Sequence, residues 1–126
     1  DFGNDIAIFA TGVMVSKSLE ASKILKQKGI NAYLLDFHTL KPLDEKTILE
    51  AAQRCGCVLT VEDHTILGGL GGATAEILGE NYPVRMKRIG LRDVFGESGD
   101  PEDLYEKYNM SVNDIVSAAE VLVKQK

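Results

Sequence analysis

The run VLTVEDHTILGGLGGA, residues 58–73, decides how this chain folds. It opens with apolar and β-branched residues, continues with two acids and a histidine, and then carries four glycines within five residues. Residues 57–61 predict a short buried strand, and the residues after the glycines predict a helix. The polar residues 62–64 are then expected just past the carboxyl end of the strand. That edge is where open α/β sheets bind ligands and partners.

Strand and helix patterns alternate on both sides of this run, which predicts helices on both faces of a mostly parallel sheet of four or five strands. The fold class is therefore α/β. The other strands are expected at Ile6–Ala10, within residues 31–37, and at Val84–Ile89, the last of these as an edge strand. Helices are expected after Thr11-Gly12, after Asp44, after the glycines, briefly at Asp100-Pro101, and after Ser111.

The helices carry recognisable ends and apolar faces. Asp44 and Ser111 are N-cap residues, Leu43 and Ile48 have the spacing of a hydrophobic staple, and Gly29 suits the C′ position. The faces predicted to be buried are Met14, Ser18, Ala21 and Leu25; Ile48, Ala51, Ala52 and Cys55; and Val112, Ile115, Val116, Ala119 and Val123.

Composition narrows the class of protein. The 126 residues suit a single domain, the hydrophobic fraction is 44%, and the net charge of −5 argues against a nucleic-acid binder. No apolar run is long enough to cross a membrane. Cys55 and Cys57 are badly spaced for a mutual disulfide, so we expect free thiols and a cytoplasmic protein. The start at Asp1, directly before a strand, suggests one domain over residues 1–126 cut from a longer chain.

The glycines raise the question of phosphate binding. A Walker loop requires Lys-Ser/Thr after the glycines, and no lysine follows them. A dinucleotide fingerprint is started by Gly69 and Gly71, but Thr74 stands where the third glycine belongs. The plainer interpretation is that the glycines allow a tight turn and a close approach of a helix start to another chain.

Glu62, Asp63 and His64 admit several interpretations. With His38, expected on the same sheet edge, they have donors suited to zinc, but the spacing matches no ligand motif. A catalytic triad needs a nucleophile beside His64, and no Gly-x-Ser-x-Gly elbow is present. The plainer interpretation is that these side chains hydrogen-bond one another and satisfy loop backbone groups.

A polar loop of mixed charge precedes the last helix. It contains Arg92, Asp93, Glu97, Ser98, Asp100 and Glu102. It is either a solvated surface loop or a segment that meets another domain or subunit.

Three strings, in order and spacing, resemble the C-terminal domain of transketolases. They are LDFHTLKPLD at residues 35–44, VEDH with GGLG at 61–64 and 68–71, and FGESGDPEDL at 95–104. The chain looks most like the C-terminal part of split transketolases. 1-Deoxyxylulose-5-phosphate synthases and the β subunits of 2-oxoacid dehydrogenase E1 components share the domain.

The resemblance implies a three-layer α/β/α domain whose five-stranded, mostly parallel sheet carries one antiparallel strand. It implies a parent transferase of pentose phosphate metabolism that moves two-carbon ketol units between sugar phosphates with thiamine diphosphate and Mg²⁺. That cofactor lies between the pyrimidine-binding and diphosphate-binding domains, so no catalytic, cofactor or metal residue carries over to this chain. The isolated domain is expected to be inactive and to support a homodimer or heterotetramer, without nucleic acid or membrane.

The resemblance also places the interface and supporting residues. They are His38, Lys41, Glu62, Asp63, His64, Gly68, Gly69, Gly71, Gly72, Arg92, Glu97 and Ser98. The alternatives are a C-terminal domain of one of the two sister enzymes, or a free-standing flavodoxin-like module that binds a small anion at residues 68–72.

Overall fold

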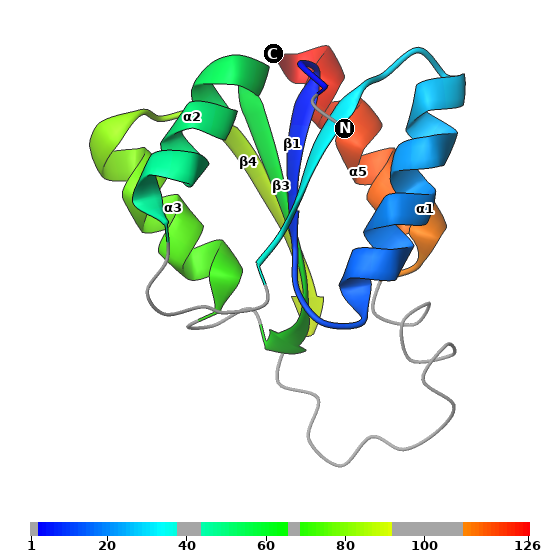
Figure 1. The fold of residues 1–126 in the computed structure, drawn as a ribbon, viewed down its shortest axis with the longest axis horizontal. Helices are drawn as coiled ribbons and strands as arrows, with labels where there is room; N and C mark the ends of the chain where they lie inside the picture. The colour runs from blue at the N-terminus through cyan, green and yellow to red at the C-terminus, as the bar shows by residue number, and fades with distance from the viewer. Residues whose placement is uncertain (1–2, 38–43, 66–68, 92–109) are drawn as a thin grey trace.

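The computed structural model describes residues 3–37, 44–65, 69–91 and 110–126. Over these residues the elements alternate from the first strand to the last helix (Figure 1). They are β1 (Ile6–Ala10), α1 (Met14–Gln27), β2 (Ala32–Asp36), α2 (Glu45–Cys55), β3 (Cys57–Thr65), α3 (Leu70–Asn81), β4 (Arg85–Leu91) and α5 (Val112–Gln125).

The sheet is parallel throughout the described residues, with strand order β2-β1-β3-β4. β1 lies in the middle because all five of its residues are apolar, and all five are buried. β4 is an edge strand in this order of the described strands, as its Arg85 and Lys87 predict. Charged side chains on an edge strand discourage pairing with other chains.

Helices cover both faces of the sheet, which gives three layers. α1 and α5 pack on one face, and α2 and α3 pack on the other (Figure 1). Alternate residues of β1 serve the two cores: Ile6 and Ile8 face α1 and α5, whereas Ala7 and Phe9 face α2 and α3. The strand period of two therefore divides one apolar strand between two hydrophobic layers.

The predicted helix faces are largely confirmed. The buried residues of α1 and α2 are those that the apolar spacing predicts, and on α5 Ile115, Val116 and Ala119 are buried while Val112 and Val123 are half-buried. Asp44 caps α2 by accepting the Thr47 backbone N–H at 3.2 Å, and the Thr47 side-chain hydrogen bond lowers the pKa of that carboxyl. Ser111 and Asp114 form a capping box on α5.

Gly29 confirms its predicted C′ role at the end of α1. Its φ of 83° is left-handed, its N–H donates to Lys26 O, and Ile30 N–H donates to Leu25 O. These two bonds are the Schellman pattern, which satisfies the last carbonyls of a helix.

Some expectations differ from the structure or fall outside it. The described residues contain four parallel strands, so the fifth, antiparallel strand implied by the resemblance is not among them. The short helix at Asp100-Pro101 and the staple residue Leu43 lie outside the described residues. α3 starts at Leu70, inside the glycine run and not after it.

The amino-terminal stretch before β1 is held at several points. Arg54 Nε donates to Asn4 Oδ1 at 2.6 Å, and Lys126 Nζ donates to Asp5 O at 2.7 Å and to Cys55 O at 2.9 Å. Cys55 and Cys57 are free and buried, as expected. Burial raises the pKa of Cys55 to about 11 and also raises that of Cys57, so both thiols are protonated at neutral pH.

No helix in the described part of the chain combines the length and the apolar character that crossing a membrane requires.

Candidate functional site

The candidate site lies where the chain reverses direction across the sheet. From β1 the chain moves outward to β2, then crosses back to β3 and continues to β4. The carboxyl ends of β1 and β3 therefore meet at a topological switch point, the place where open α/β sheets bind ligands and partners. The Thr11 N–H, just past β1, donates to Val61 O of β3 at 3.1 Å and ties the two ends together.

A buried carboxylate organises this point. Glu62 is 1% exposed, and its side chain reaches the first turn of α3. Its Oε1 accepts the Leu70 N–H at 3.1 Å, and its Oε2 accepts the Gly71 N–H at 2.8 Å. The helix needs this help because its N-cap, Gly69, has no side chain with which to cap it.

The electrostatics of this contact favour the charged carboxylate. A helix N-terminus carries a partial positive charge, and hydrogen bonds to an ionised acceptor are stronger than those between neutral groups. Both effects offset the cost of burying the charge of Glu62. The two hydrogen bonds of Glu62 thus join the end of β3 to the start of α3.

The structure corrects the expected end of β3. Residues 62–64 lie within the strand, which runs to Thr65, and not past its end. Val61 pairs with Ile89 and Thr65 with Leu91, so four steps along β3 match two along β4, and the register shifts between these pairs. Such a bulge lets a strand continue while its extra residues leave the ladder. Polar residues can therefore occupy the strand without ending it.

Gly71 lies in a tight contact beneath this junction. A Cβ at position 71 would come within 2.8 Å of Arg88 Cδ and 3.0 Å of Thr60 Oγ1. A side chain at position 71 would therefore crowd the packing of α3 on β3 and β4, and Arg88 and Thr60 would have to shift to admit it. Gly72 is different, because a Cβ there would meet no atom of the described residues within 4 Å. Gly72 leaves open space on the outer side of the helix start.

Buried hydroxyl groups surround the junction. Thr60 and Thr74 are fully buried and Thr11 is 4% exposed, and none of their hydroxyl oxygens has a hydrogen-bond partner within the described residues. No local pattern in the sequence predicts the burial of Thr74 or the packing of Arg88 on Gly71. Only the pairing of β3 with β4 and the rotation of α3 bring these residues together.

The predicted interface residues divide into three groups. Glu62, Gly69, Gly71 and Gly72 come together at the start of α3. Asp63 and His64 belong to the bulged end of β3. His38, Lys41, Gly68, Arg92, Glu97 and Ser98 lie outside the described residues.

The chemical alternatives raised by the sequence find limited support here. The two backbone N–H groups of Leu70 and Gly71 already bind Glu62, so they are not free to bind a phosphate. Within the described residues no three His, Cys, Asp or Glu side chains group closely enough to hold a metal ion. The expectation that the polar residues satisfy nearby backbone groups is confirmed for Glu62.

The fold and the braced junction define an open, doubly wound α/β domain with its candidate site at the switch point. The chain belongs to the transketolase C-terminal domain family, since the model "Transketolase, C-terminal domain" matches residues 1–115. This confirms the resemblance drawn from the three sequence strings.

Curated relatives fall into more than one class of enzyme. The 6-deoxy-6-sulfo-D-fructose transketolase subunit SqwH of Clostridium sp. (strain MSTE9) is 45% identical over 98% of this chain and 38% of its own length. The 1-deoxy-D-xylulose-5-phosphate synthase of Caldanaerobacter subterraneus is 45% identical over 90% of this chain and 18% of its own length. The putative transketolase C-terminal section of Methanocaldococcus jannaschii is 43% identical over 90% of this chain and 35% of its own length.

Solved structures agree with the family. A structure described as "split gene transketolase, inactive beta4 tetramer" matches with a TM-score of 0.91 and 43% identity, over 97% of this chain and 40% of that one. Transketolase from Pichia stipitis, at 21% identity and a TM-score of 0.64, shares the fold. The chain thus spans two fifths or less of each of these proteins.

We expect Glu62→Gln to lower the free energy of unfolding by about 2–3 kcal/mol. The amide can accept only one of the two backbone N–H groups and points its own NH₂ at the other. Urea denaturation measures the loss, and amide hydrogen exchange should speed up at Leu70 and Gly71. Glu76→Gln, on the exposed side of α3, is the matched control and should change neither quantity. Equal stability of the two variants would show that the carboxylate does not hold the helix.

Gly71→Ala and Gly72→Ala should have opposite effects on stability. In Gly71→Ala the new Cβ pushes against the side chains of Arg88 and Thr60, which should lower the free energy of unfolding by about 1–2 kcal/mol, as overpacking does. The second places a better helix former in open space and should stabilise by up to about 1 kcal/mol. Thermal unfolding of both variants side by side measures the difference, and shifts of the same sign would contradict the packing seen at Gly71.

Proposed function

We propose that this chain is the C-terminal domain of a thiamine-diphosphate-dependent transketolase that transfers two-carbon ketol units between sugar phosphates. Its own role is assembly: it docks the switch-point edge against the cofactor-binding parts of the enzyme. The observation that carries this proposal is the match over 97% of the chain, at a TM-score of 0.91, to a split-gene transketolase tetramer. The description of that tetramer as inactive agrees with a supporting role for this domain.

The residues at the edge suit docking better than catalysis. Glu62, the buried acid of the site, is engaged by the start of α3 and serves to hold the junction in place. Thiamine diphosphate is held through its diphosphate by a divalent metal. The described residues contain no cluster that could hold a metal ion, and the N–H groups of Leu70 and Gly71 are already bound to Glu62. We therefore assign the cofactor and Mg²⁺ to other domains or subunits of the enzyme.

The partners follow from the same argument. They are the pyrimidine-binding and diphosphate-binding domains or subunits, in a homodimer or heterotetramer. The open space beside Gly72 allows another backbone to approach the first turn of α3 closely. We propose that Asp63 and His64, at the bulged end of β3, take part in the same contact.

A second candidate is supported by the comparisons. A 1-deoxy-D-xylulose-5-phosphate synthase is as similar to this chain as the sulfofructose transketolase subunit is, at 45% identity. The docking role is the same in both cases, whereas the reaction of the whole enzyme differs. The reaction class is therefore decided by assay of the intact protein.

The intact protein, supplied with thiamine diphosphate and Mg²⁺, should transfer a ketol unit from a ketose phosphate to an aldose phosphate. Chromatography or coupled detection of the new ketose phosphate measures it. Residues 1–126 alone should show no turnover, because they lack the cofactor site. Turnover by the 126-residue chain would overturn the assembly role, and condensation of pyruvate with an aldose phosphate in place of ketol transfer would favour the synthase.

Gly72→Gln should weaken subunit association of the intact enzyme without unfolding the domain. The new side chain enters space that is open in the free domain and that we assign to the docked neighbour. Sedimentation velocity should show a dissociation constant raised by about tenfold, a change of about 1.4 kcal/mol. Activity per assembled enzyme should be unchanged.

The matched control is Gly79→Gln on the same helix. A Cβ at position 79 also meets nothing within 4 Å, but the residue lies near the carboxyl end of α3, away from the switch point. It should leave association unchanged. If the two variants associate equally well, the start of α3 is not an interface.

A further inference from the structure

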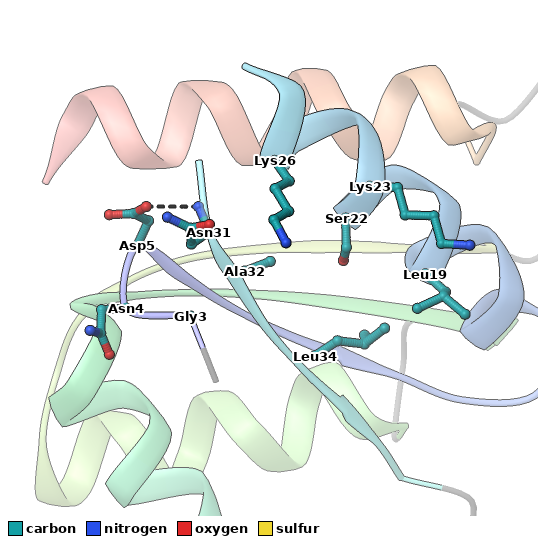
Figure 2. A pocket seen from close by; sticks show the side chains of 10 residues that line it. All are labelled: Gly3, Asn4, Asp5, Leu19, Ser22, Lys23, Lys26, Asn31, Ala32 and Leu34. Atoms are coloured by element: carbon teal, nitrogen blue, oxygen red, sulfur yellow. Dashed lines mark hydrogen bonds between the residues drawn. The ribbon is translucent and has the colours of Figure 1, made fainter. Parts of the chain in front are cut away.

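A second surface lies at the opposite end of the strands from the switch point, near their amino ends. Between α1 and the edge strand β2 is an open hollow of about 840 Å³, close to the amino ends of β1 and β2 (Figure 2). β2 ends the sheet on this side, and among the described residues no other helix packs beside α1 over this strand. Lys23, Lys26 and Leu19 line it from the helix, and Asn31 and Leu34 line it from the β2 side.

The polar part of the hollow is positively charged. Lys23 and Lys26 lie three residues apart on α1, and neither side-chain ammonium group has a hydrogen-bond or ion-pair partner among the described residues. Asp5 is the only acid of the lining, and its Oδ2 accepts the Asn31 N–H at 2.7 Å (Figure 2). The lining thus carries a net charge of +2 − 1 = +1 in a chain whose net charge is −5.

The nearby helix end does not cancel this charge. Carbonyl groups at the end of a helix carry partial negative charge. At α1 the N–H groups of Lys28, Gly29 and Ile30 bond the last carbonyls at 2.9–3.3 Å. These bonds reduce the negative potential beside Lys26, so the two ammonium groups determine the charge of this rim.

The other part of the hollow is apolar. Leu19 is 49% exposed, a large fraction for a leucine, and Leu34 of β2 is half-buried. In Figure 2 both side chains extend at the end of the hollow away from Asp5 and Asn31. Covering them would remove apolar surface from water, at roughly 25 cal/mol per Å².

We propose that this hollow binds a phosphomonoester that carries an aromatic or apolar group. A phosphomonoester has close to two negative charges at neutral pH, which matches Lys23 and Lys26, and it offers acceptors to the Asn31 side-chain amide. Its apolar group covers Leu19 and Leu34. The inference does not rest on the proposed assembly role, because the hollow and the switch point lie at opposite ends of the strands.

Phenyl phosphate is the probe, titrated into the intact protein and followed by calorimetry or amide chemical shifts. We expect saturable binding with shifts confined to α1 and the start of β2. Inorganic phosphate and phenol, each carrying one half of the probe, should bind at least about tenfold more weakly, about 1.4 kcal/mol each. Equal affinity for inorganic phosphate, or no saturation by phenyl phosphate, would overturn the proposal.

Substitutions separate the two halves of the site. Lys23→Ala with Lys26→Ala should weaken phenyl phosphate binding at least tenfold, whereas Lys28→Ala, whose Nζ pairs with Glu120 at 3.2 Å, should not. Leu19→Ser should weaken the binding of phenyl phosphate but not that of inorganic phosphate. Val121→Ser, at a residue of α5 that is 45% exposed, is the control and should change neither affinity. All five substituted residues are exposed, so the fold tolerates the changes. Binding unaffected by the lysine substitutions would place the probe elsewhere.

Discussion

The two hydrogen bonds that the Glu62 carboxylate accepts from the first backbone N–H groups of α3 form the contact on which this domain depends most. A glycine-rich helix start has no side chain of its own with which to satisfy these donors, and the strand that leads to it carries a bulge. Glu62 supplies the missing acceptors, because it lies in the bulged end of β3 and its carboxylate reaches the start of α3. The position of α3, its close packing through Gly71 and the shape of the switch-point edge all follow from this one contact.

The two edges of the sheet present different surfaces. The carboxyl edge holds a braced junction with buried hydroxyls and open space beside Gly72, which suits contact with another protein surface. The amino edge holds a hollow with a cationic rim and an apolar end, which suits a small amphipathic anion. The residues just before β1 are fixed to the end of α2 through Arg54 and to the end of α5 through Lys126.

The comparisons explain why fold and reaction must be kept apart in this family. Enzymes of two classes match this chain at the same 45% identity, and the match covers 38% of one and 18% of the other. In the proposed assembly role the domain supplies surfaces and not reacting groups, and such a domain can serve both, because one fold can support different reactions. The features shared with these relatives are therefore expected to concern packing and assembly.

The sequence by itself determined the alternating α/β order, the buried faces of α1 and α2, the caps at Asp44 and Ser111, and the family. Those features depend on local periodicity and on the hydrogen-bonding groups of single side chains, which can be recognised without knowing the fold. The tertiary structure alone decided that β3 continues through residues 62–64, that α3 starts at Leu70, and that Glu62 caps it. It also decided the contact of Gly71 with Thr60 and Arg88 and the hollow beside β2. These features depend on strand register and on which elements lie at the sheet edge, and such relations between distant residues leave no periodic signal in the sequence.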